Sequence, residues 1–265
     1  MPKQPMHEWF SNCARHAKLF AMCGRFVLKT SLAELQQYFG IQRLKYTPEP
    51  SFNIAPTQTV AAVVENTNGT RGLVGLKWGL IPPWSADESV ATKMINARSE
   101  TLHEKPSFRD AFHHQRCLIL ADGFFEWKKG QKTPFFIYDH DRKPLAFAGI
   151  YSFWKRPQDG ERLATCAIVT TAANAKIEAL HHRMPVILSA EAQRQWLRKD
   201  LSDTGPLLDL LKPYPAEQTA FHPVNPAINK VQENRPENLD RYNAEPPTGP
   251  QQTALFEQLF DQPLD

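Results

Sequence analysis

Short apolar runs separated by polar turns recur along most of the chain. Runs rich in Val, Ile, Leu and Phe, bounded by Gly, Pro, Asn or Asp, are typical of β-strands. The predicted strands cover residues 25–29, 59–65, 73–81, 117–129, 134–139, 145–154, 164–173 and 219–224.

Helical signals are fewer. Ser31 and Glu34 have the spacing of a capping box and Gly40 is suited to end a helix, so a helix is predicted over 32–39. Further predictions are helices over 174–180 and 189–198, a helical turn over 107–113 and a loop over 82–90. Many strands with few helices predict an α+β fold that is β-rich, with a curled, barrel-like sheet and short peripheral helices.

Composition sets limits on what the chain can be. With 265 residues, 42% apolar and 22% charged, it can bury a large core in one domain with tails. A formal charge of +3 permits nucleic-acid binding but requires a local basic groove for it. Cys117 and Cys166 lie in apolar runs and are predicted to be buried. No Cys/His cluster has zinc spacing, so neither a metal nor a cofactor is expected.

Five strings carry the candidate chemistry, in this order: MCGRF (22–26), WGLIPPW (78–84), INARSET (95–101), DGFFEW (122–127) and HHRMPVIL (181–188). Together they resemble the SRAP family, the SOS-response-associated or abasic-site processing proteins. The resemblance implies a β-rich fold with a DNA-binding groove and a covalent crosslink to abasic sites in single-stranded DNA. Because the four cysteines do not suggest a disulfide scaffold, we expect a cytoplasmic, nucleoid-associated protein, and we expect it to be a monomer.

Cys23 is the predicted nucleophile. In the family, the Cys after the initiator Met becomes the mature N-terminus. An α-amine has a pKa of about 7.7–8.0 against about 10.4 for lysine, so on the order of 10% of it is unprotonated at neutral pH. It can form a Schiff base with the aldehyde of a ring-opened abasic sugar, and the neighbouring thiol can then close a thiazolidine ring.

The chain ends raise separate questions. Residues 1–22 contain no apolar stretch of signal-peptide length, and no run reaches the ~18 apolar residues of a membrane span. Because Cys23 needs a free amine, we expect either translation from Met22, with 1–22 as a mis-assigned start, or removal of a leader; the family is also described as self-processing. The SRAP domain is predicted to cover 23–232, and the polar, proline-rich segment 233–265 to be a disordered linker with a short C-terminal segment.

Three further residues are assigned to catalysis by the resemblance. Asn96 is expected to hold the Cys backbone or the sugar hydroxyl with its side-chain amide. Glu126 is expected to transfer protons, although its alternation with two aromatic neighbours leaves its burial open. His181 is expected to be the proton shuttle for ring opening and crosslink reversal, with His182 incidental.

The predicted DNA contacts lie close to these strings. Three arginines are assigned to phosphates, because guanidinium groups suit phosphate clamping: Arg25, Arg98 and Arg183. Trp84 is a candidate stacking wedge, worth about 1–3 kcal/mol per base. By resemblance alone, Asn53 and Pro56 line the pocket near Cys23.

The tail carries a weaker signal. Gln252, Leu255 and Phe256 have the Q-x-x-L-F spacing of peptides that bacterial replication proteins insert into the sliding clamp. The same residues also fit a short amphipathic helix that packs back on the domain. Both interpretations stay open.

Two other functions fit the same residues. In a cysteine-type peptidase, Cys23 attacks peptide bonds with His181 as base, and a blocked terminus is tolerated. In a non-catalytic nucleic-acid binding module, the histidine and glutamate are structural and binding is fully sensitive to SDS. A heat-stable, SDS-resistant adduct with abasic single-stranded DNA is expected only for the crosslinking protein.

Overall fold

The computed structural model describes residues 24–201 and 203–243. Several predictions therefore lie outside the described residues: those on the segment 1–22, on Cys23 and on the clamp-type motif at Gln252, Leu255 and Phe256.

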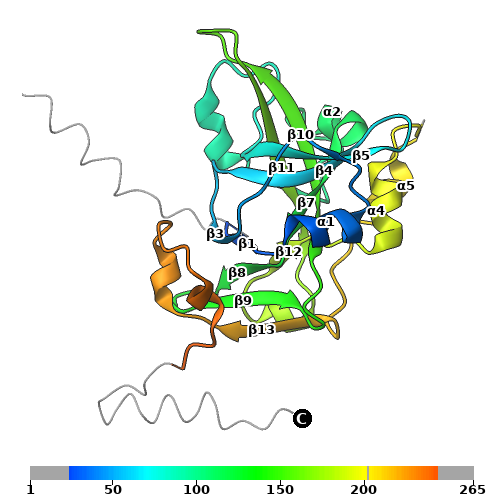
Figure 1. The fold of residues 1–265 in the computed structure, drawn as a ribbon. Coiled ribbons are helices and arrows are strands. Elements are labelled where there is room, and N and C mark those ends of the chain that lie inside the picture. The colour runs from blue at the N-terminus through cyan, green and yellow to red at the C-terminus, as the bar shows by residue number, and fades with distance from the viewer. Residues whose placement is uncertain (1–23, 202, 244–265) are drawn as a thin grey trace, which may run out of the picture.

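The larger of two sheets closes on itself into a barrel (Figure 1). Its strand order is β12-β11-β10-β7-β4-β5-β2, with β6 also paired to β11, and a parallel β5–β11 pairing closes the five strands β4, β5, β11, β10 and β7 into a ring. This confirms the predicted curled, barrel-like sheet. The strands are β2 (Arg43–Leu44), β4 (Thr59–Glu65), β5 (Arg71–Trp78), β6 (Asn96–Arg98), β7 (Arg116–Ala121), β10 (Leu145–Lys155), β11 (Arg162–Ala172) and β12 (Arg183–Pro185).

The second sheet lies below the barrel in Figure 1 and contains the first described strand. Its order is β13-β9-β8-β1-β3, and all of these neighbours are antiparallel. The strands are β1 (Phe26–Leu28), β3 (Ser51–Ile54), β8 (Gly123–Trp127), β9 (Pro134–Asp139) and β13 (Thr219–Pro223).

The single strand predicted over 117–129 is wrong, because the chain turns a corner at Asp122 from β7 in one sheet to β8 in the other. The Asp122 carboxylate accepts hydrogen bonds from the backbone N–H groups of Lys29 and Thr30 and from the Thr30 hydroxyl. A Cβ on Gly123 would lie 2.5 Å from the carbonyl oxygen of Ile137, so only glycine fits there. Both strands are almost entirely buried, so apolar residues lie on either side of Asp122 and Gly123 and mask the corner in the sequence.

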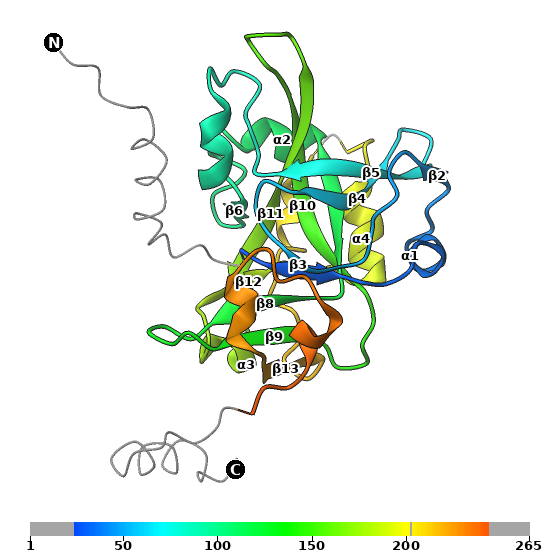
Figure 2. The ribbon, with the colours of Figure 1, turned by 60° about the vertical axis from the view of Figure 1, so that its left-hand side comes forward.

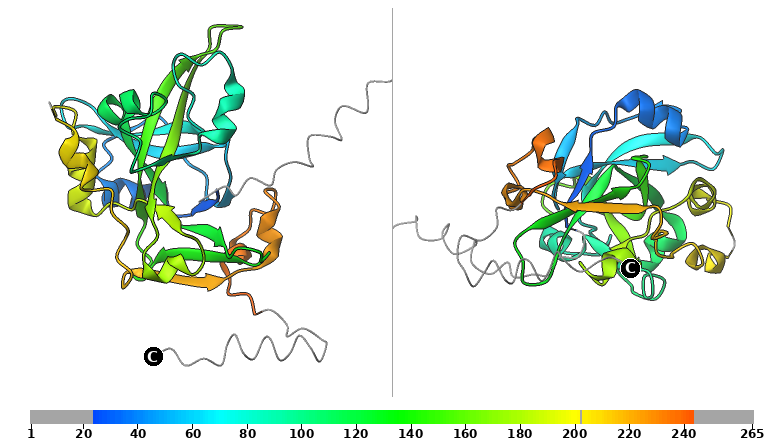
Figure 3. Two further views of the ribbon diagram at one scale, coloured as in Figure 1. Left: turned by 180° about the vertical axis from the view of Figure 1, so that it is seen from behind. Right: turned by 90° about the horizontal axis from the view of Figure 1, so that it is seen from below.

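Short helices sit on the outside of the sheets, as predicted (Figure 3). In α1 (Leu32–Phe39), the Ser31 hydroxyl accepts from the backbone of Glu34, the Glu34 carboxylate accepts from the Ser31 backbone, and Gly40 ends the helix with φ 63°. The others are α2 (Arg109–His114), α3 (Ala175–Glu178), α4 (Ala190–Leu197) and α5 (Gly205–Leu208), with 3₁₀ turns η1 (Glu88–Lys93), η2 (Pro226–Asn229) and η3 (Pro236–Leu239). η1 begins within the predicted loop and extends three residues beyond it.

Residues 233–243, which were predicted to begin the disordered linker, make contacts with the domain. The side-chain oxygen of Asn234 accepts from the backbone N–H of Phe52 at 2.6 Å, and His222 Nε2 bonds to the carbonyl of Leu239 at 2.8 Å. The backbone N–H of Tyr242 donates to Pro223 at 2.9 Å. This segment has the polar composition of a disordered linker, but polar contacts hold it against the domain. Composition alone does not show such contacts.

The core takes up the large aromatic side chains with their polar atoms satisfied. Trp78, Trp154 and Trp196 are buried, and each indole N–H donates to a backbone carbonyl. Cys117 and Cys166 are buried as predicted, which raises the pKa of both thiols. Within the described ranges, none of the helices has the length and apolar composition needed to cross a membrane.

We predict that Asp122→Ala destabilises the protein by about 1–3 kcal/mol, because it leaves three part-buried donors at the corner without an acceptor. Urea unfolding followed by circular dichroism measures the change. Asp209→Ala, at an exposed carboxylate, is the matched control and should cost less than about 0.5 kcal/mol. Equal losses in the two variants would show that the corner does not depend on Asp122.

Candidate functional site

Glu126 lies near the end of β8, at the place where the described chain begins. Strands β1 and β8 pair Phe26 with Phe124, and the backbone N–H of Phe125 donates to Arg25 at 2.9 Å. Continuing this antiparallel register sets Gly24 opposite Glu126. Glu126 is only 2% exposed and Gly24 is buried. The carboxyl left open by sequence alternation is thus inside the protein, next to the residue that follows Cys23.

Asn96 opens β6, a strand the sequence pattern did not indicate. β6 runs parallel to β11, with Asn96 opposite Ile168, whose backbone N–H donates to the carbonyl of Ile95 at 3.0 Å. The indole of Trp78 donates to the same carbonyl at 2.9 Å. These two bonds fix the backbone immediately before Asn96 against the barrel.

His181 lies in the turn before β12 and is held through one ring nitrogen. Its Nδ1 lies 3.1 Å from the backbone nitrogen of Arg183 and 3.2 Å from the carbonyl oxygen of Arg183. Nδ1 can therefore accept from the N–H when unprotonated, or donate to the carbonyl when protonated. Either state leaves Nε2 to exchange a proton with a substrate, as a shuttle requires. Desolvation by burial lowers the pKa of His181 below the ordinary value, so the ring is neutral at pH 7.

His182 occupies a different environment. It is exposed, and its ring lies 4.4 Å from that of His181 between centroids. Its backbone carbonyl accepts from Ala173, which fixes the turn rather than any proton path.

Arg183, predicted to clamp a DNA phosphate, is buried and engaged inside the protein. Its guanidinium makes a two-pronged ion pair with Glu100 and donates to the carbonyl of Thr170 at 2.6 Å. Arg183 thus connects β12 to β11 and to the turn after β6. Its backbone nitrogen and carbonyl oxygen are also the groups that contact Nδ1 of His181. Glu100, within the INARSET string, was not singled out by the sequence.

Arg25 and Asn53 are likewise engaged with the protein's own backbone. Arg25 donates to the side-chain oxygen of Asn53 at 2.7 Å and to the carbonyl of Ile228 at 2.9 Å, and its burial lowers its pKa. The side-chain amide of Asn53 donates to the carbonyls of Ile228, Lys230 and Glu233. Together they hold the C-terminal segment 228–233 against β3, a role that no local pattern indicates.

The other predicted DNA contacts are accessible. Trp84 is 66% exposed on the loop after β5, Arg98 is exposed at the end of β6, and Pro56 is half-buried after β3. Their predicted contacts with DNA stay predictions.

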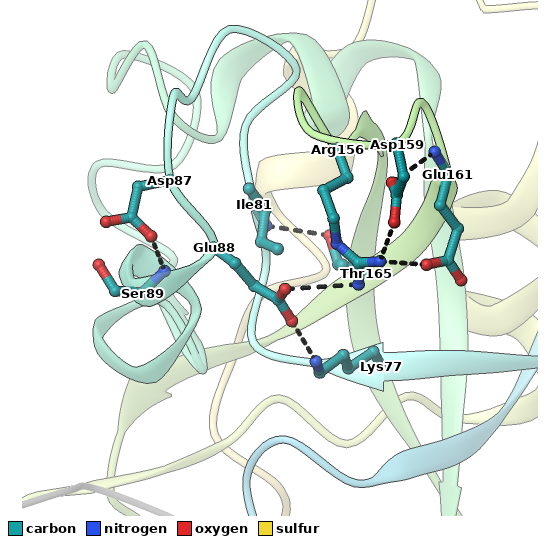
Figure 4. Close-up of polar contacts among 9 residues, drawn as sticks. All are labelled: Lys77, Ile81, Asp87, Glu88, Ser89, Arg156, Asp159, Glu161 and Thr165. Carbon is teal, nitrogen blue, oxygen red and sulfur yellow. Dashed lines mark hydrogen bonds and ion pairs between the residues drawn. The ribbon is translucent and has the colours of Figure 1, made fainter.

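An ion-pair cluster braces the segment that follows Trp84 (Figure 4). The Glu88 carboxylate bridges Lys77 of β5 and Arg156, which lies 3.6 Å from it at the tip of the β10–β11 hairpin. Before Trp84, the backbone N–H of Ile81 donates to the Thr165 hydroxyl at 2.9 Å. The exposed indole therefore projects from a loop fixed on both sides.

The sequence and fold of this chain match those of known proteins. The profile of the SOS response associated peptidase (SRAP) family matches residues 22–231. The chain belongs to the SRAP family. The resemblance that the five strings indicated is thereby confirmed.

Named SRAP relatives share much of this sequence. The abasic site processing protein YoqW of Bacillus subtilis (strain 168) is 41% identical over 228 residues, covering 83% of this chain and 100% of the relative. The abasic site processing protein YedK of Escherichia coli (strain K12) is 34% identical over 219 residues, covering 79% and 95%. A crystal structure of a protein from Bacteroides thetaiotaomicron matches with a TM-score of 0.73 and 28% identity, covering 83% and 100%.

We predict that Glu100→Gln lowers the free energy of unfolding by about 1–2 kcal/mol, because it removes the charged acceptor of a buried guanidinium. It should also shift the imidazole NMR resonances of His181, which shares the Arg183 backbone. Glu104→Gln, at an exposed carboxylate in the same turn, is the control. Unchanged His181 resonances in Glu100→Gln would separate the ion pair from the histidine.

Proposed function

We propose that this SRAP protein binds single-stranded DNA at abasic sites and joins itself to the ring-opened sugar through Cys23. Three relatives at 32–41% identity carry the name abasic site processing protein, which supports the substrate. The observation that carries the proposal is the burial of Glu126 on β8, whose register with β1, continued by two residues, brings it opposite Gly24, the residue after Cys23.

The reaction needs proton transfers and no oxidant. The amine of Cys23 adds to the sugar aldehyde, and loss of water gives an imine. The thiol then adds to the imine carbon, its proton moves to the nitrogen, and a thiazolidine forms. Glu126 is suited to move protons at the amine and the departing water. His181 is suited to take the proton of the sugar hydroxyl at Nε2 during ring opening, and Asn96 to orient the sugar or the Cys backbone.

The DNA strand on either side of the lesion contacts exposed side chains of the protein. Trp84, exposed on its braced loop, is suited to stack on one base at any sequence. Arg98, exposed at the end of β6, is suited to hold a phosphate.

The two alternatives share the same residues and are separated by the chemistry of the adduct. A cysteine-type peptidase uses the thiol alone and accepts a blocked N-terminus. A binding module forms no covalent product. Both covalent reactions need a general acid as well as a base, because the amine that leaves a cleaved peptide bond must be protonated, so only the adduct itself separates them.

We predict that Cys23→Ser, with a free terminus, still forms an imine but no stable ring, so its adduct with abasic single-stranded DNA survives SDS only after borohydride reduction. Protein beginning at Cys23 is the reference, and the same protein with an acetylated terminus is the control that should give no adduct. An untreated, heat-stable Cys23→Ser adduct would disprove the thiazolidine.

We predict that Glu126→Gln and His181→Ala each slow crosslinking by about 10²-fold or more, the lower end of the range for general acid–base catalysis. Binding to intact single strands should be unchanged, whereas Arg98→Glu should weaken it, with the loss reduced at high salt. Anisotropy and quenched gel time courses measure the two steps. A His181→Ala protein with wild-type rates of formation and reversal would exclude His181.

The lowered pKa of His181 gives a pH prediction. As the pH falls through that pKa, the basic form of the ring is lost. The ratio of wild-type to His181→Ala rates should therefore stay constant at neutral pH and fall only below about 6.5, the ordinary histidine value. Taking the ratio cancels the titration of the α-amine. A ratio that declines from pH 8 downward would contradict this assignment.

A further inference from the structure

The turn between β8 and β9 begins directly after Trp127 and is rich in lysine. Lys128, Lys129 and Lys132 lie in this turn, and all three are exposed. Lys230, also exposed, follows η2 in the C-terminal segment. We name these four residues the lysine surface.

Hydrogen bonds hold the two parts of the lysine surface together. The side chain of Asn229 accepts from the Trp127 indole at 2.8 Å and donates to the carbonyl of Lys132 at 3.1 Å. At the base of the turn, the backbone N–H of Val224 donates to Pro134 at 2.9 Å. Figures 2 and 3 show the β8–β9 turn beside the segment that carries η2. Lys230 is therefore fixed next to the turn although about a hundred residues separate them in sequence.

Within the described part of the chain, the charges of the lysine surface have no carboxylate partner. Elsewhere, Lys77 pairs with Glu88 and Lys143 with Asp141. Across residues 24–201 and 203–243, no carboxylate forms an ion pair with any member of the lysine surface. Like charges held together repel one another, and an external anion relieves that repulsion.

The position of the lysine surface identifies the anion. The turn continues the strand that carries Glu126, so it lies at the edge of the candidate site. Arg25 and Arg183 are engaged with internal partners and leave the phosphates near this edge to other cations. Lysine is a flexible point charge, which suits successive backbone phosphates of a strand rather than one fixed carboxylate.

We propose that the lysine surface binds the backbone phosphates of the DNA strand on one side of the lesion. This rests on the proposed function. Arg98 and Trp84 come from β6 and the loop after β5, so they serve other parts of the strand. The lysine surface then adds affinity without reading sequence and without taking part in the chemistry.

The first test measures binding of intact single-stranded DNA by anisotropy over a salt series. The variant Lys128→Gln/Lys129→Gln/Lys132→Gln should bind at least ten-fold more weakly at low salt. Its slope of log K against log salt should fall by about 2, since each phosphate contact contributes about 0.7. The control Lys45→Gln/Lys155→Gln/Lys212→Gln removes the same charge from exposed lysines on other elements and should change affinity less than two-fold. Equal effects in both variants would overturn the proposal.

The second test places the lysine surface on one flank. In one oligonucleotide the abasic site lies near the 5′ end, and in a second it lies near the 3′ end. Each oligonucleotide therefore has only one flank that is long enough to reach the lysine surface. The turn variant, and Lys230→Gln more mildly, should lose affinity for one of the two and not the other. Equal loss for both, or none, would contradict a one-sided contact.

The crosslinking rate at saturating abasic DNA separates this proposal from the proposed function. It should be the same in the turn variant and the wild type. Absence of any adduct in both, with the affinity loss still present, would disprove the covalent function and leave the lysine surface standing. A normal adduct with unchanged affinity would disprove the role of the lysine surface and leave the covalent function standing.

Discussion

The candidate site depends on β11, because four other strands of the larger sheet pair with it. This strand pairs with β10 and β5 to close the barrel and also carries β6 and β12. Asn96 and the backbone of Arg183 are thereby set on two sides of one rigid strand, and the Arg183–Glu100 ion pair connects them across it. Since hydrogen bonds to a closed barrel leave little freedom, side chains from distant parts of the sequence are positioned without a ligand.

The second sheet contributes the other half of the site through the corner at Asp122. Because the corner moves the chain from β7 to β8, Glu126 reaches the end of β1, where the chain leads to Cys23. The carboxylate of Asp122 holds the backbone that follows β1, so one residue secures both strands. In the proposed reaction Glu126 acts beside Cys23 as the N-terminal residue, and such anchoring holds the two together, since chain ends otherwise fray.

Arginine and lysine have divided roles in this protein. Arg25 and Arg183 use their planar forks on carbonyl and carboxylate groups within the fold, where several donors in fixed geometry are needed. The lysines of the β8–β9 turn are exposed and form no ion pair with a carboxylate of residues 24–201 or 203–243. Charge counting along the sequence treats both residue types as equal cations, and only their surroundings distinguish a structural cation from one open to phosphate.

Local patterns were sufficient for much of the fold and for the family. The capping box of α1 and most long strands follow from neighbouring residues, and the five strings identify SRAP because each is a local sequence. The corner at Asp122, the short strands β6 and β12 and the packed segment 233–243 required the tertiary structure. Their stabilising partners are remote: Arg183 and Glu100 are 83 residues apart, and Asn53 and Glu233 are 180 apart. Periodicity and composition carry no information on such contacts, because these are decided by which surfaces meet when the barrel closes.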